Sequence, residues 1–147
     1  ASTYPLDSVE EHYFYSKKTK IADLSSISYQ ASFGLKPKFV LDAVKEQLDS
    51  FTIVAPKATH DLKTKVTNDL IDLIDLDGGK IFYTTSGAES VENALKLARL
   101  STGKKTILAR RPSYHGATLG AVSVTGDWRN QDVPTLDQWT VRIPEPH

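Results

Sequence analysis

The sequence predicts an α/β fold, and three observations carry this prediction. Residues 81–85, Ile-Phe-Tyr-Thr-Thr, form a short run of aromatic and β-branched residues that is typical of a strand. After Ser86 the apolar residues recur at helical spacing, at Val91, Ala94, Leu95 and Ala98. Residues 105–109 then predict a second strand. Strand, helix and strand in this order predict a βαβ unit with parallel strands and a right-handed crossover.

The helix of this unit carries signals at both of its ends. Ser86, followed three residues later by Glu89, forms a capping box, and Gly103 is placed to end the helix in the left-handed conformation. Unpaired N–H groups and a positive dipole at a helix start attract anions, and Gly87 leaves the backbone open to close approach. A phosphate held by the Ser86 hydroxyl and the N–H groups of Gly87 and Ala88 fits this pattern. An ordinary capped helix explains the same residues.

The first part of the chain predicts a hairpin between two loops. Residues 1–11 are polar and predict a loop or a short helical arm. Residues 12–24 contain an aromatic run, a Lys-Lys turn and an alternating run, which together predict a β-hairpin. Residues 27–34 are small and polar around two aromatic residues, so we expect a loop there.

Two helices are predicted between this loop and the βαβ unit. An apolar stripe follows Pro37, at Val40, Leu41, Val44, Leu48 and Phe51. Residues 51–58 have no clear period and predict a loop, after which Thr59 is a candidate N-cap. A second stripe then follows, at Leu62, Val66, Leu70, Leu73 and Ile74. Residues 75–79 are polar and rich in glycine, which predicts a turn into the first strand.

The last part of the chain places a second motif at the same sheet edge as Ser86. Residues 113–118 follow the second predicted strand at its carboxyl end, just as Ser86 follows the first. Ligands of open α/β sheets bind at that edge, which supports a phosphate site there. Beyond this motif the sequence predicts a short helix, a loop and a strand, at residues 119–124, 125–138 and 139–143.

The composition argues against several classes of partner. The 147 residues contain 18 Lys+Arg and 18 Asp+Glu, so no net field favours nucleic acid or an anionic membrane. Cysteine is absent, which excludes disulfides, thiolate catalysis and cysteine-ligated zinc. No apolar run is long enough to span a bilayer, and the four histidines lack the spacing of a metal site. We therefore expect a cytoplasmic protein without a membrane, nucleic-acid or metal partner.

Two motifs together resemble the class III aminotransferases, which use pyridoxal 5'-phosphate (PLP). Residues 85–99, Thr-Ser-Gly-Ala-Glu-Ser-Val-Glu-Asn-Ala-Leu-Lys-Leu-Ala-Arg, resemble the cofactor-phosphate turn and helix of that family. Residues 113–118, Ser-Tyr-His-Gly-Ala-Thr, are similar to its aromatic-His-Gly motif, in the same order and at a similar spacing. The resemblance implies the PLP-dependent transferase fold type I. Residues 1–50 would belong to the small domain, and residues 51–147 would begin the large cofactor-binding domain and its sheet.

The resemblance also implies roles for seven residues. Tyr114 would stack on the cofactor ring, His115 would fix its loop by hydrogen bonds, and Gly116 would let the chain turn close to the cofactor. An aromatic residue at the place of Tyr29 often faces the substrate in this family; the alternative is that its ring packs in a core. The family commonly has Gly-His-x-His/Arg-Pro after this loop, where this chain has Gly-Leu-Lys-Pro. The phosphate-binding residues would be Ser86, Gly87 and Ala88.

The activity implied is transfer of an amino group from an amine or omega-amino acid to a 2-oxo acid such as pyruvate. The family's enzymes are homodimers, in which the loop at residues 51–58 would approach the partner's site. They are also much longer, so we expect a fragment that lacks the Schiff-base lysine and the ring-nitrogen aspartate, contains no catalytic residue and is inactive alone. Two alternatives remain open: a non-catalytic phosphate-ligand-binding module, and a structural α/β fragment without cofactor affinity.

Overall fold

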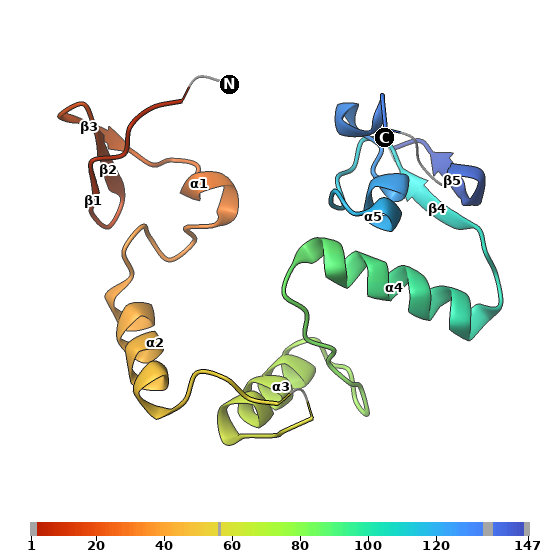
Figure 1. The fold of residues 1–147 in the computed structure, drawn as a ribbon, viewed down its shortest axis with the longest axis horizontal. Helices are drawn as coiled ribbons and strands as arrows, with labels where there is room; N and C mark the ends of the chain where they lie inside the picture. The colour runs from red at the N-terminus through yellow and green to blue at the C-terminus, as the bar shows by residue number, and fades with distance from the viewer. Residues whose placement is uncertain (1–2, 56, 134–136, 146–147) are drawn as a thin grey trace. The chain divides into compact units, whose positions relative to one another are not determined.

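The computed structural model describes residues 3–55, 57–133 and 137–145. The chain divides into two compact units, residues 1–60 and residues 61–147, whose elements follow one another in the colours of Figure 1. Pro56 in the predicted loop at residues 51–58 and residues 134–136 in the predicted loop at residues 125–138 lie outside the described residues. Among the described residues, no helix combines the length and the apolar character that crossing a membrane requires.

A three-stranded antiparallel sheet forms the first part of unit one. Its strands are β1 (Ser8–Val9), β2 (Tyr13–Ser16) and β3 (Thr19–Ala22), in the order β1-β2-β3. The predicted hairpin is confirmed, and Lys17 and Lys18 both have positive φ, as a tight two-residue turn requires. The prediction of a loop or helical arm for residues 1–11 is wrong at β1, which pairs with β2. A strand of two residues is too short to show an alternating pattern in the sequence.

A left-handed turn and a regular helix complete unit one. The turn, α1 (Ser26–Tyr29), has positive φ at all four residues, and the Asp23 carboxylate accepts the N–H groups of Ser25 and Ile27 at 3.1 and 3.2 Å. The helix, α2 (Lys38–Ser50), confirms the stripe predicted after Pro37. Phe51, the last member of that stripe, is extended with φ −163° and lies just beyond the helix.

Unit two contains the elements that carry the predicted cofactor motifs. Its helices are α3 (Asp61–Leu73), α4 (Gly87–Thr102) and α5 (Leu119–Val124), its strands are β4 (Ile107–Arg110) and β5 (Thr140–Ile143), and its 3₁₀ turns are η1 (Trp128–Asn130) and η2 (Asp137–Trp139). The three helices confirm their predicted positions. The helix α3 begins at Asp61, so Thr59, the predicted N-cap, lies two residues before its first residue. Gly103 ends α4 with φ 68°, as predicted.

The sheet of unit two differs from the predicted βαβ unit. Residues 81–84 form no strand, so the expected first strand and its parallel pairing with the second are wrong for the described residues. Instead β4 pairs in parallel with β5, from Ile107 opposite Thr140 to Arg110 opposite Ile143. Strand assignment needs a neighbour that completes the hydrogen-bond ladder, and the β-rich composition of residues 81–85 cannot supply that neighbour.

The core of unit two lies where α5 packs against β4. The buried apolar residues are Ala109, Ala121, Val122 and Val124. Arg142 on β5 donates its guanidinium N–H groups to the carbonyls of Ser123 and Val124, each at 2.7 Å. These carbonyls are the last two of α5, so Arg142 caps the carboxyl end of the helix. This core holds the loop between β4 and α5, which contains the aromatic-His-Gly motif.

Candidate functional site

The first candidate residues lie at the start of α4, where extended backbone becomes helix. Ser86 has φ −154° and ψ 161°, and its Oγ accepts the Glu89 N–H at 3.2 Å. The Glu89 carboxylate accepts the N–H and the hydroxyl of Thr85, each at 2.8 Å. The Thr85 N–H, followed by its hydroxyl, lowers the pKa of Glu89. The capping box is therefore present, with its carboxylate bonded one residue before the N-cap.

The N–H groups of Gly87 and Ala88 are open at this helix start. Within the described part of the chain, neither N–H has a hydrogen-bond acceptor. A Cβ built on Gly87 would meet no heavy atom within 4 Å. A phosphate needs both the donors and this room, and the helix dipole favours its negative charge. The residues therefore fit the predicted phosphate, and their role in holding it stays a prediction.

Gly116 brings the second predicted motif against the first. Its φ is 130°, a conformation that side chains rarely adopt, and a Cβ built there would lie 2.6 Å from the Ala88 Cβ. The same Cβ would lie 3.2 Å from the Ala121 Cβ. Only glycine lets the loop approach the first turn of α4 so closely. The aromatic-His-Gly motif and the phosphate turn, which are about 30 residues apart, are thereby neighbours in space.

Glu92 joins α4 to the start of α5. Its Oε1 accepts the N–H groups of Gly120 and Ala121 at 2.8 and 3.2 Å. The Thr118 side chain is the largest contributor to lowering the pKa of Glu92, and these two N–H groups add to it against the opposing effect of burial. Glu92 was not predicted from the sequence, because its partners lie 28 and 29 positions away and leave no local pattern.

We expect the Glu92 carboxylate to make part of the stability depend on pH. Its folded-state pKa is lowered, so its contribution is full above the unfolded pKa and is lost as pH falls through the folded value. Glu92→Gln should remove this pH-dependent contribution. Near neutral pH the free energy of unfolding should fall by about 1 kcal/mol after solvent screening. Urea unfolding between pH 7 and pH 3 measures both effects, with Glu46→Gln, an exposed glutamate on α2, as the control. Equal acid dependence in the Glu92 variant and the wild type would contradict the expectation.

Tyr114 and His115 are both exposed on the loop between β4 and α5. The Tyr114 side chain is 55% exposed, and the Arg129 guanidinium carbon lies 4.7 Å from its ring centroid. His115 donates its backbone N–H to the Thr125 Oγ1 at 3.0 Å. This hydrogen bond joins the main chain of His115 to the residue that follows α5, and the role of His115 beside the cofactor stays a prediction.

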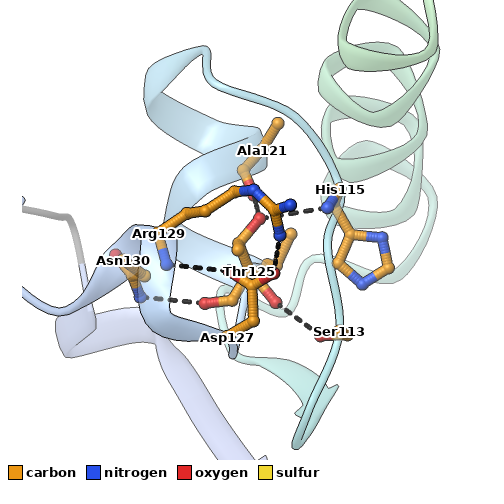
Figure 2. A network of polar contacts seen from close by, with 8 residues as sticks. Ser113, His115, Ala121, Thr125, Asp127, Arg129 and Asn130 are labelled. Carbon is orange, nitrogen blue, oxygen red and sulfur yellow. Dashed lines mark hydrogen bonds and ion pairs between the residues drawn. The ribbon is translucent and has the colours of Figure 1, made fainter. Parts of the chain in front are cut away.

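Thr125 is the centre of the polar network around this loop (Figure 2). Its side chain is fully buried, and its Oγ1 accepts from His115 and donates to the Ala121 carbonyl at 2.9 Å. Its own carbonyl accepts the Asn130 side chain at 2.8 Å, and the next N–H, of Gly126, bonds the Ser113 carbonyl at 2.8 Å. From the sequence, Thr125 is predicted to begin an ordinary loop. Its only sequence signal is a hydroxyl directly after the apolar run that ends α5.

The remaining site residue, Tyr29, belongs to unit one. It ends the left-handed turn α1, and its side chain is 89% exposed there. The six cofactor residues all lie in unit two, and the substrate-facing role of Tyr29 remains a prediction. Among the described residues, no group of three or more histidine, aspartate or glutamate side chains is arranged to hold a metal ion.

Known proteins that resemble this chain are aminotransferases, the family that the two motifs also indicate. The family described as "Aminotransferase class-III" matches residues 16–142. Aminotransferase PigE of a Serratia species is 37% identical over 97 residues, which are 65% of this chain and 11% of that protein. An acetylornithine aminotransferase of Methanosarcina acetivorans is 33% identical over 107 residues, 71% of this chain and 27% of that protein.

Solved structures share the fold. The taurine:2-oxoglutarate aminotransferase from Bifidobacterium kashiwanohense, in complex with PLP and glutamate, aligns with a TM-score of 0.90 and 31% identity. The alignment covers 99% of this chain and 34% of that one. Across these three proteins the chain spans between 11% and 34% of their length.

Proposed function

Because the chain belongs to the class III aminotransferase family, we propose that it supplies the phosphate-binding part of a PLP-dependent transaminase of fold type I. The enzyme would move an amino group from an amine or omega-amino acid to a 2-oxo acid such as pyruvate. The observation that supports this best is the approach of Gly116 to Ala88, which joins the phosphate turn and the aromatic-His-Gly motif at one place.

The start of α4 binds the phosphate in this proposal. When bound, PLP supplies an electron sink for the bonds at the amine carbon. The Ser86 hydroxyl and the N–H groups of Gly87 and Ala88 donate hydrogen bonds to the phosphate oxygens, and the helix dipole stabilises their charge. The Glu89 carboxylate is hydrogen-bonded to Thr85, so it does not occupy the N–H groups of Gly87 and Ala88, which remain for the phosphate.

The loop between β4 and α5 orients the cofactor in this proposal. The exposed Tyr114 ring stacks on the pyridine ring, an aromatic contact worth on the order of 1 kcal/mol beyond its buried area. Gly116 keeps this loop against α4, so the ring contact and the phosphate contacts act on one molecule together. Residues that hold both the phosphate and the ring of PLP would keep it in one orientation, which a reaction at a single carbon needs.

We assign no catalytic residue to these 147 residues. The imine-forming lysine of the family has no matching motif in the sequence, and Lys80, Lys96 and Lys104 are exposed. The lysine and the ring-nitrogen aspartate are therefore expected elsewhere in the enzyme. The assembly that we propose is a cytoplasmic homodimer. In it, residues 51–58 approach the partner's site, and Tyr29 faces the substrate.

The test uses the complete natural protein that contains this sequence. We expect it to bind PLP with a visible absorbance band and to transfer amino groups from at least one of several amines to pyruvate. Tyr114→Ala should raise the dissociation constant of PLP about fivefold, whereas Tyr114→Phe should stay within about twofold, because stacking needs the ring and not the hydroxyl. A protein that binds phosphate without the visible band would contradict the transaminase. A Phe variant as damaged as the Ala variant would contradict the stacking role.

A further inference from the structure

Residues 125–129 follow α5, and two of their side chains contact the predicted cofactor motif. The first contact is made by Thr125, whose buried hydroxyl lies between the His115 N–H at 3.0 Å and the Ala121 carbonyl at 2.9 Å. Figure 2 shows this hydroxyl between α5 and the loop that carries His115. Because the Thr125 side chain is 0% exposed, water has no access to replace it. The His115 N–H therefore depends on this one hydroxyl group for its hydrogen bond.

The second contact is made by Arg129. Its guanidinium carbon lies 4.7 Å from the ring centroid of Tyr114 and 4.7 Å from that of Trp128. Asp127 orients this arginine, since its carboxylate accepts the Arg129 N–H at 2.9 Å and pairs with the guanidinium group. A cation over an aromatic face is attracted by the ring quadrupole. The Tyr114 ring is thus held by a cation that the short turn η1 fixes in place.

We infer that Thr125 and Arg129 are positioning residues for the cofactor. Thr125 sets the main chain at His115, and Arg129 sets the ring plane of Tyr114. The inference rests on the proposed function, in which Tyr114 stacks on the PLP ring. Stacking depends on the distance and tilt of the two rings, so a loop that moves weakens it although every cofactor-binding group is still present.

The experiment measures the dissociation constant of PLP by fluorescence titration of the cofactor-free, complete natural protein. Thr125→Val keeps the shape but leaves the His115 N–H without its acceptor, and should raise the constant about tenfold. Thr125→Ser restores the hydroxyl and should stay within about twofold of the wild type. Arg129→Leu should raise the constant about two- to fivefold, and should have no effect once Tyr114→Ala is also present.

Thermal unfolding of each cofactor-free variant separates positioning from simple stability. The Arg129 side chain is 45% exposed, so its Leu variant should unfold only a few degrees below the wild type, through the lost ion pair with Asp127, while binding PLP less tightly. Unchanged binding in both Thr125→Val and Arg129→Leu, with weaker binding in Tyr114→Ala, would overturn this inference and leave the proposed function in place. Equal losses from Arg129→Leu with and without Tyr114 would also overturn it. Unchanged binding in Tyr114→Ala would instead overturn the stacking role on which it rests.

Discussion

Gly87→Asp should weaken PLP binding by the complete natural protein about a hundredfold while the cofactor-free protein stays at least as stable. A carboxylate at this position lies within a few ångströms of the proposed phosphate, and two like charges at that separation repel by several kcal/mol at a protein surface (about 4 kcal/mol at 4 Å). The side chain has room, because no heavy atom lies within 4 Å of a Cβ there.

Gly87→Asp should lose PLP affinity without losing stability, and this combination distinguishes a lost phosphate contact from a damaged fold. An acidic residue in the first turn of a helix stabilises it by about 0.3–1 kcal/mol. Gly87→Ala is the matched control: it adds the Cβ without charge and should stabilise α4 by about 0.4–1 kcal/mol, with only a small change in binding. Titration calorimetry with PLP and urea unfolding measure the two quantities. Tight binding by the Asp variant would contradict the phosphate assignment, whereas a less stable cofactor-free protein would contradict the open helix start.

Gly116→Ala should lower both the free energy of unfolding and the affinity for PLP. The new Cβ would lie 2.6 Å from the Ala88 Cβ and 3.0 Å from its Cα, so the loop between β4 and α5 must move away from α4. Overpacking and a φ of 130° together should cost about 2–4 kcal/mol. Because the loop carries Tyr114, its displacement should also remove the ring contact with the cofactor.

Two further variants separate the contact from the backbone conformation. Gly103→Ala also places a side chain at positive φ, 68°, but a Cβ there meets nothing within 4 Å. It should cost only the conformational part, about 1–2 kcal/mol. Ala88→Gly in the Gly116→Ala background removes the nearest colliding atom and should recover part of the lost stability and PLP affinity. If Gly103→Ala and Gly116→Ala cost the same, or if Ala88→Gly recovers nothing, the approach of the loop to α4 is not what requires glycine.

The candidate site could be predicted from the sequence to the extent that its parts are local. The capping box depends on two residues three positions apart, and both Ser86 and Glu89 bond as the pattern predicts. The Ser-Tyr-His-Gly motif was located by its resemblance, and the structure places Gly116 of that motif against Ala88. Glu92, Thr125 and Arg129 were missed, because their partners lie between 10 and 29 positions away or across a loop.

By itself the sequence determined the helices, the hairpin and the family. Helical spacing, turn residues and capping act within a few positions, so α2, α3, α4 and α5 and the pair of β2 and β3 lie where the patterns predict. Tertiary structure alone decided which strands pair and what holds the motif loop. Residues 81–85 have the composition of a strand but no hydrogen-bonded partner strand among the described residues, whereas β4 pairs with β5, which lies about thirty residues later in the chain. Ladders, buried hydroxyl bonds and the approach of Gly116 to Ala88 each need two distant segments, and no single stretch of sequence contains both.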